Sequence, residues 1–366
     1  MISPATPRRA FQPAARPLLI GSLPLTDHQE AMQWIVAHTP EIPLWPQLPE
    51  YTREGMVYQF LPGLPGIVRQ GKKVMVDTGL DGFDAQLLAF YEDYLAIDAK
   101  TPIPDTSRFR LTPETAPGFF VFMETVKNMA EPPLSVKGQI TGPLTQGVAI
   151  TDQHGRVLFY DERLKDAVIK LIAMKARWQV EQMLTLQTPA PPLVFFDEPG
   201  AVSFGSSAFI SITREQVVAA LQECIQAVQA AGGLAGIHIC ANGEWSVALE
   251  AGTDIISFDA YSYFDKLILY RDPLKQFIQA GGILAWGIVP TSDTQAIARE
   301  DAKTLYGRWR RQFTELVALG LEPSRVLQQT LITPACGTGS LPYPEALKVL
   351  SLTRELSDRV RSRFKV

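Results

Sequence analysis

Residues 214–240 read REQVVAALQECIQAVQAAGGLAGIHIC, and this stretch contains the unit from which we predict the fold of the whole chain. From Arg214 to Ala230 the apolar residues recur at three- and four-residue spacing, which predicts an amphipathic helix. Leu234–Cys240 is a short, mostly apolar run, which predicts a buried strand after that helix. A long helix followed by a short buried strand is typical of a parallel sheet covered by helices.

The same alternation of short strands and long helices continues in both directions from this unit. The eight predicted strands are Leu18–Ser22, Ile42–Trp45, Leu134–Ile140, Leu193–Phe196, Leu234–Cys240, Ile255–Phe258, Ile283–Gly287 and Leu327–Thr333. The predicted helices include Asp27–His38, Asp84–Ile97, Arg163–Leu186, Arg214–Ala230, Asp293–Leu319 and Tyr343–Arg361. Strands separated by helices favour parallel pairing and right-handed crossovers. Eight such units in 366 residues predict an α/β fold, the (β/α)8 or TIM barrel.

The chain shows no internal repeat and no flexible linker, so we expect one domain. Residues 1–16 are expected to form an N-terminal extension and residues 17–366 the barrel. The extension has no apolar segment followed by a cleavage site, so it is not expected to be a signal peptide. Tyr51–Pro133 is predicted to be an insertion after the second strand, with helices and a hairpin around Lys72–Asp77.

The charge and composition of the chain give no reason to expect nucleic acid or a membrane as a partner. The formal net charge of −4 gives no electrostatic reason to expect nucleic acid or an anionic membrane surface. No apolar run approaches the roughly 20 residues of a membrane-spanning helix. Three distant cysteines form no disulfide framework, which favours a reducing, cytoplasmic setting.

Two of those three cysteines follow predicted strands and, with a histidine, form a possible metal site. His238 and Cys240 lie at the end of the fifth strand, and Cys336 follows the eighth. Imidazole and thiolate are ligands that zinc prefers, and a catalytic zinc site has three protein ligands and one open position. The alternative is that both cysteines are small buried residues and the histidine a hydrogen-bonded core residue. Asp259, after the sixth strand, fits either a fourth ligand or a cap of the next helix.

Other residues at the predicted strand ends suggest a small charged substrate. The backbone of Ile20–Ser22 could offer N–H groups to a carboxylate. Glu50 and Asp197 follow the second and fourth strands, although each could also be an ordinary turn or capping residue. Because the carboxyl ends of barrel strands share one face, a soft metal, two carboxylates and backbone donors would lie together. This set fits an amino-acid thiol.

Taken together, these segments resemble the C-terminal catalytic barrel of cobalamin-independent methionine synthase. That family belongs to a superfamily that includes uroporphyrinogen decarboxylase and the zinc methyltransferases acting on coenzyme M. The resemblance extends over nearly the whole chain from about Leu18. Its motifs are Ile20–Pro24, which resembles IGSFP; Glu50–Val57, similar to E-x-x-R-N-D-M-V; Val136–Thr145, which contains a segment like KGxLTGPVT; and Phe196–Pro199, similar to IDEP.

The resemblance implies a cytoplasmic enzyme of methionine biosynthesis that methylates the thiol of homocysteine with the help of Zn²⁺. Matched positions imply that His238, Cys240, Asp259 and Cys336 are metal ligands, with aspartate where the family usually has glutamate. His238, Cys240 and Cys336 would be catalytic through the zinc. Homocysteine would be held by Ile20, Gly21 and Ser22 at its carboxylate and by Glu50 and Asp197 at its amino group.

Three positions depart from the family and concern the methyl donor. The positions of its folate-stacking tryptophan, folate-contacting glutamate and proton-donating histidine are Ala149, Ser203 and Ser292 here. A methyl-tetrahydrofolate nitrogen needs protonation as the methyl group leaves, whereas reduced cobalt does not. We therefore predict methylcobalamin, or a methylated corrinoid protein as a possible partner, as the donor.

Three alternatives remain open at this stage. They are corrinoid-dependent methylation of another thiol such as coenzyme M, decarboxylation of a porphyrinogen without metal, and a non-catalytic role in methyl-donor binding or regulation. A fold hosts many functions, so the site must decide among them.

Overall fold

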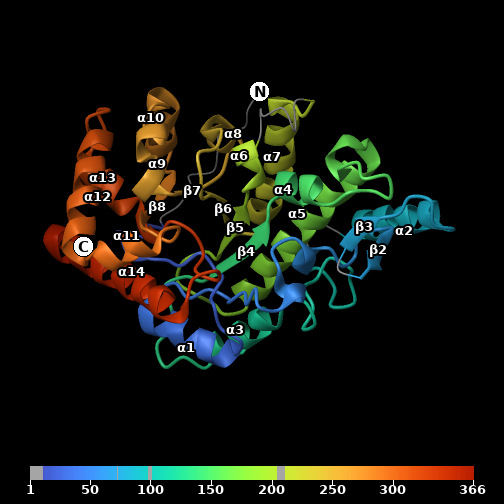
Figure 1. Ribbon diagram of the computed structural model, residues 1–366, viewed down its shortest axis with the longest axis horizontal. Coiled ribbons are helices and arrows are strands. Elements are labelled where there is room, and N and C mark those ends of the chain that lie inside the picture. The colour runs from blue at the N-terminus through green and yellow to red at the C-terminus, as the bar shows by residue number, and fades with distance from the viewer. Residues whose placement is uncertain (1–10, 72, 98–100, 204–210) are drawn as a thin grey trace.

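In the computed structural model, which describes residues 11–71, 73–97, 101–203 and 211–366, parallel strands form one curved sheet with helices along its outside (Figure 1). Within these residues the sheet has seven strands in the order β1-β9-β8-β7-β6-β5-β4. The strands are β1 (Arg16–Pro17), β4 (Lys137–Thr141), β5 (Leu193–Asp197), β6 (Leu234–Ile239), β7 (Ile255–Phe258), β8 (Ile283–Val289) and β9 (Thr330–Pro334). This confirms the predicted α/β fold with a parallel, barrel-like sheet.

Helices separate the strands, as the periodicity predicts. The α-helices are α1 (His28–His38), α2 (Phe83–Ala96), α3 (Pro117–Lys127), α4 (Pro143–Ala149), α5 (Glu162–Leu184), α6 (Gly200–Ser203), α7 (Arg214–Ala230), α8 (Trp245–Glu250), α9 (Ala260–Leu267), α10 (Arg271–Gln279), α11 (Thr294–Arg299), α12 (Ala302–Val317), α13 (Pro323–Gln328) and α14 (Tyr343–Phe364). Short 3₁₀ turns are η1 (Thr52–Glu54), η2 (Tyr58–Phe60) and η3 (Leu158–Tyr160). In the described part of the chain, none of these helices is both long and apolar enough to cross a membrane.

The predicted second strand, Ile42–Trp45, is not a regular strand. Its segment lies between the two edges of the sheet and makes isolated parallel bridges, Leu44 to Lys137 and Gln47 to Ser22. The physical reason is that Pro43 and Pro46 have no N–H group, so a continuous ladder cannot form there. This segment therefore pairs with its neighbours only through isolated bridges.

Other predicted boundaries are wrong as well. The last strand begins at Thr330 rather than Leu327, because α13 continues to Gln328, and the third begins at Lys137 rather than Leu134. The first strand occupies Arg16–Pro17 rather than Leu18–Ser22, although the Leu18 N–H still donates to the Ile332 carbonyl at 2.9 Å. The predicted helix Asp293–Leu319 is two helices, α11 and α12, because Asp301 caps a new helix with its side chain.

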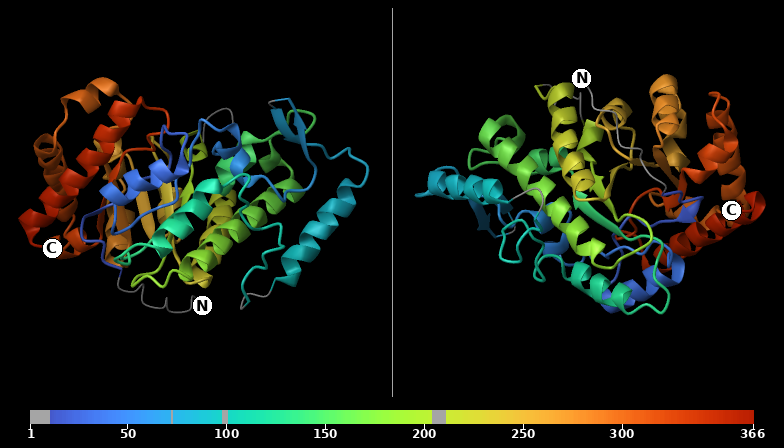
Figure 2. Two further views of the ribbon diagram at one scale, coloured as in Figure 1. Left: turned by 90° about the horizontal axis from the view of Figure 1, so that it is seen from below. Right: turned by 180° about the vertical axis from the view of Figure 1, so that it is seen from behind.

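The predicted insertion is present. Its hairpin pairs β2 (Ile67–Gln70) with β3 (Lys73–Val76) in antiparallel register, and Lys72 itself lies outside the described residues. The hairpin and α2 lie at one side of the molecule, far from α12 and α14 (Figures 1 and 2). The strands β4 to β9 are buried along almost their whole length, as expected for a parallel sheet covered by helices.

Candidate metal centre

His238, Cys240 and Cys336 lie together at the carboxyl ends of the strands. His238 is in β6, Cys240 directly follows that strand, and Cys336 lies two residues after β9. One ligand atom from each residue falls within 4.8 Å of the other two. Since β7 and β8 separate β6 from β9 in the sheet, the curvature of the sheet brings the three side chains into one group.

The His238 ring is held in an orientation that suits a metal ligand. Its Nδ1 lies 2.9 Å from the Oγ of Ser257, its neighbour across the β6–β7 ladder. Its buried Nε2 has no hydrogen-bond partner among the described residues. When Nδ1 donates to Ser257, Nε2 carries a free lone pair, and an outer hydrogen bond of this kind is typical of metal-binding histidines. A buried polar atom without a partner is costly, so the group fits a cation that would satisfy it.

The two sulfur atoms form a coupled pair. A hydrogen bond from Cys336 lowers the pKa of the Cys240 thiol, and the adjacent His238 lowers it further against the opposing effect of burial. The same pairing, together with burial, raises the pKa of Cys336. The ionisation of each thiol therefore depends on the other. A divalent cation favours the thiolate form of both.

Asp259 has the capping role that the sequence left open. Its side chain accepts a hydrogen bond from the Ser262 N–H at 2.8 Å and forms the N-cap of α9. It is not part of the group formed by His238, Cys240 and Cys336. Burial raises the pKa of Asp259, and the charge of Cys240 contributes to that shift, so the two side chains are electrostatically linked.

Asp197 lies beside the candidate metal group. It pairs with His238 across the β5–β6 ladder, and its buried Oδ1 has no hydrogen-bond partner among the described residues. Burial raises the pKa of the Asp197 carboxyl, while the neighbouring His238 and Lys137 oppose that shift. An unpartnered buried carboxylate oxygen is a suitable site for a substrate cation.

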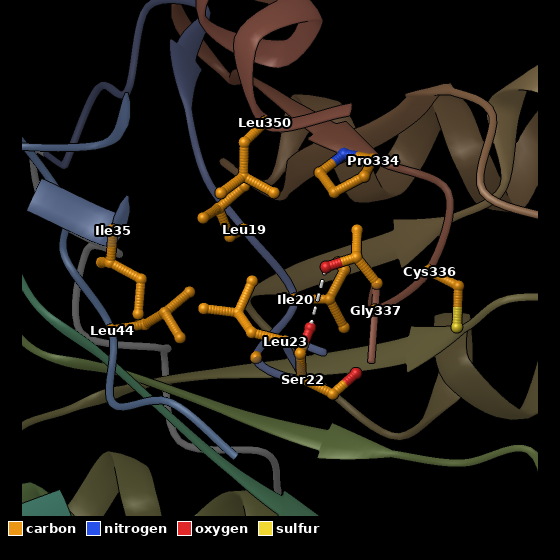
Figure 3. Close-up of a pocket in the computed structure, with 12 residues that line it drawn as sticks. Leu19, Ile20, Ser22, Leu23, Ile35, Leu44, Pro334, Cys336, Gly337 and Leu350 are labelled. Carbon is orange, nitrogen blue, oxygen red and sulfur yellow. Dashed lines mark hydrogen bonds between the residues drawn. The ribbon is translucent and has the colours of Figure 1, made fainter. Parts of the chain in front are cut away.

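The end of the first strand lies against the loop that carries Cys336. The Ser22 carbonyl accepts hydrogen bonds from the Thr338 N–H at 3.0 Å and the Thr338 hydroxyl at 3.1 Å. Figure 3 shows Ile20 and Ser22 beside Gly337 and Cys336. A Cβ at Gly337 would fall 2.1 Å from the Ser22 Oγ, so a larger residue there would force the Ser22 side chain to move. Across the described residues, the N–H groups of Gly21 and Ser22 donate to no other residue.

These residues surround one cavity of about 300 Å³. Its walls contain the His238, Cys240 and Cys336 group, Asp197, and Ile20 with Ser22 from the turn after β1. Met56 lines it from an exposed position. The full lining is Ile20, Ser22, Gln47, Pro49, Glu54, Met56, Asp197, Pro199, His238, Cys240, Cys336, Gly337, Gly339 and Ser340. No lysine or arginine is among these described lining residues.

Glu50 and Glu54 differ from the sequence expectation. Glu50 is exposed and lines a neighbouring depression, which shares Gly339 and Ser340 with the main cavity. Glu54 is buried in the wall of the main cavity, where its carboxylate lies 3.0 Å from the His28 Nε2 and accepts from the Leu48 N–H at 3.2 Å. Sequence reasoning assigned no role to Glu54 or His28, and no local signal connects residues 26 positions apart.

Comparisons with known proteins give a match in structure only. No family model matches the chain, and no curated protein matches it in sequence. Among solved structures it is similar to a B12-independent methionine synthase from Shewanella sp. W3-18-1 in complex with selenomethionine, with a TM-score of 0.56. The match covers 97% of this chain and 99% of that chain at 14% sequence identity. At that identity the similarity is one of fold, and it supports the barrel-like architecture described above.

Proposed function

We propose that this protein is a zinc-dependent methyltransferase that converts homocysteine to methionine. One observation carries the proposal. A single cavity contains a soft His/Cys/Cys ligand group and an unpartnered buried carboxylate oxygen, and the free N–H groups of Gly21 and Ser22 lie at the turn that borders it. These three features match the thiol, ammonium and carboxylate of one amino acid. The similar structure is named as a methionine synthase, which supports the same substrate class.

The donor set fits zinc, and His238, Cys240 and Cys336 would hold it. When bound there, zinc would lower the pKa of a substrate thiol so that a nucleophilic thiolate exists at neutral pH. The resemblance would add Asp259 as a fourth ligand, whereas its capping bond to the Ser262 N–H favours a site with three protein ligands. The chain itself would orient the substrate: Asp197 would bind the ammonium group, and Gly21 and Ser22 the carboxylate. Pro49, Met56 and Pro199 would limit access of water to the reacting sulfur.

The lining favours an amino-acid thiol over coenzyme M. A sulfonate requires strong donors, and arginine or lysine normally supplies them. None of the described lining residues is a lysine or arginine, whereas Asp197 suits an ammonium group. Homocysteine carries that ammonium group and coenzyme M does not.

For the methyl donor we propose methylcobalamin or a methylated corrinoid protein. The support is chemical: Ala149, Ser203 and Ser292 stand where the resembled family has groups that hold folate and protonate its nitrogen. Cobalt in its reduced state is a good leaving group and needs no such proton. The similar structure is named B12-independent, so the donor needs its own experiment.

The experiment incubates zinc-loaded protein with homocysteine and either methylcobalamin or methyl-tetrahydrofolate, and measures methionine. We expect methionine from methylcobalamin only, and none when Cys336→Ala replaces the wild type. Methionine from methyl-tetrahydrofolate alone would overturn the donor assignment. Methylation of coenzyme M but not homocysteine would overturn the substrate assignment.

A further inference from the structure

Lys137 is a buried charged residue to which the proposed reaction assigns no role. It begins β4, its side chain is 1% exposed, and its ammonium group donates to the Ile20 carbonyl. It also donates to Gln139 Oε1 at 3.2 Å and lies 4.9 Å from the centre of the Phe195 ring. No carboxylate contacts it directly among the described residues, since Asp197 acts on it only through its charge. Burial lowers the pKa of Lys137 to about 8, which still leaves it mostly protonated at neutral pH.

The bond from Lys137 fixes one particular peptide group. The Ile20 carbonyl and the Gly21 N–H belong to the same planar unit, and a trans peptide directs them to opposite sides. A donor that holds the carbonyl therefore also sets the direction of the Gly21 N–H. A cation on the carbonyl oxygen polarises the unit and strengthens that N–H as a donor.

Gly21 and Gln47 define the shape of the backbone at this turn. Gly21 has a φ of +154°, a conformation that residues other than glycine rarely adopt. Gln47 holds the turn from one side. Its N–H donates to the Gly21 carbonyl at 3.1 Å, and its carbonyl accepts from the Leu23 N–H at 3.0 Å. These bonds leave the N–H groups of Gly21 and Ser22 without partners in the described residues.

We propose that Lys137 is the positioning residue for recognition of the substrate carboxylate: by holding the Ile20 carbonyl it presents the Gly21 N–H to that carboxylate, beside the Ser22 N–H, whose peptide group is held by Gln47. This inference rests on the proposed function, because it takes homocysteine as the substrate. It makes Lys137 a determinant of specificity for thiols that carry a carboxylate, although it does not touch them.

Lys175 provides a matched control. It is also buried at 1% exposure, and its ammonium group donates to the Arg110 carbonyl at 2.8 Å and the Arg108 carbonyl at 3.4 Å. It comes from α5, and neither it nor its carbonyl partners line the cavity. If a buried lysine had only a structural role, replacing Lys137 and replacing Lys175 would have the same effect on ligand binding.

The experiment measures, by calorimetry, the binding of three thiols to zinc-loaded protein. Homocysteine has both charged groups, 4-mercaptobutyrate lacks the amine, and 3-mercaptopropylamine lacks the carboxylate. We expect Lys137→Met to weaken the two carboxylate-bearing thiols by about tenfold and 3-mercaptopropylamine by less than about twofold. Lys175→Met should change the affinity for no thiol by more than about twofold. If Lys137→Met does not fold, Lys137→Gln replaces it in the experiment, because glutamine keeps a neutral donor. We expect this variant to lose affinity for the same two thiols, by a smaller factor.

The outcomes separate this inference from the proposed function. Equal weakening of all three thiols by the Lys137 variants, or unchanged homocysteine binding, would overturn the role of Lys137 while leaving the proposed function in place. A wild-type protein that binds homocysteine no tighter than 3-mercaptopropylamine has no carboxylate site. That result would overturn the proposed substrate and, with it, the role of Lys137.

Discussion

Asp197 and His238 are direct neighbours in the parallel ladder between β5 and β6. Both side chains line the same cavity, and each carries an atom without a hydrogen-bond partner in the described residues, Oδ1 of Asp197 and Nε2 of His238. The proposed site for the substrate ammonium and the proposed ligand for the metal are therefore one strand apart. This spacing suits a ligand whose amine and thiol are separated by a short carbon chain.

Asp197→Asn should selectively weaken thiols that carry an amine. Asparagine is nearly the same size and keeps the packing, but it removes the negative charge. We expect the dissociation constant for homocysteine to rise by about tenfold and that for 4-mercaptobutyrate to change little. Calorimetry on zinc-loaded protein measures both. A matching loss for 4-mercaptobutyrate would mean that Asp197 acts on the site as a whole and not on the ammonium group.

Zinc content should depend on two of the three cysteines. Cys240→Ala and Cys336→Ala each remove a sulfur from the group that fits zinc, so we expect purified protein to lose most of its metal. Cys224→Ala is the control, because Cys224 is buried in α7, its thiol donates to the Ile169 carbonyl at 3.7 Å, and it is not in the His/Cys/Cys group. Elemental analysis of the purified variants measures the zinc. Equal zinc in all three variants would exclude the His/Cys/Cys site.

Asp259→Asn separates the two roles open to that residue. Asparagine is as good an N-cap as aspartate but a much weaker metal ligand. Since Asp259 already caps α9 and lies outside the ligand group, we expect this variant to keep both its stability and its zinc. Asp259→Ala should lose about 1 kcal/mol of unfolding free energy through the missing cap. Loss of zinc from a stably folded Asp259→Asn protein would instead show that the carboxylate is a ligand.

The arrangement of strands and helices could largely be predicted from the sequence, because burial on a parallel sheet leaves a strong local pattern. The strand Ile255–Phe258 and the helix Arg214–Ala230 have the predicted bounds. The pattern of apolar residues gave wrong predictions where a cap or a proline interrupts a regular element. Asp301 interrupts an otherwise continuous helical repeat, and Pro43 with Pro46 prevents an apolar segment from pairing as a strand.

The candidate site could be predicted only where a motif lies at a strand end. His238, Cys240 and Cys336 are drawn together by the topology itself, so spacing and resemblance were enough to group them. The supporting contacts are long-range and leave no local signal. Lys137 reaches the Ile20 carbonyl across 117 positions, and Glu54 in η1 meets His28 at the start of α1 across 26 positions.

The carboxylate that acts with Asp197 can be identified by comparing Glu50→Gln with Glu54→Gln. The family resemblance selects Glu50, whereas the structure puts Glu54 in the cavity wall and Glu50 in the adjoining depression. Charges act over short distances in a buried site and are screened by water at the surface. We therefore expect Glu54→Gln to raise the dissociation constant for homocysteine by about fivefold, and Glu50→Gln by less than about twofold.

His28→Gln completes this comparison, because it removes the partner of Glu54 and leaves the carboxylate. If Glu54 acts through its charge on the ammonium group, His28→Gln should keep homocysteine binding at or above the wild-type level. If Glu54 and His28 only fasten η1 to α1, both variants should weaken all thiols alike, including 4-mercaptobutyrate. A larger effect of Glu50→Gln than of Glu54→Gln would return the role to Glu50. It would also require the turn between Pro49 and Gly55 to move toward the cavity when substrate binds, since Glu50 lines the neighbouring depression and is not among the described residues that line the cavity.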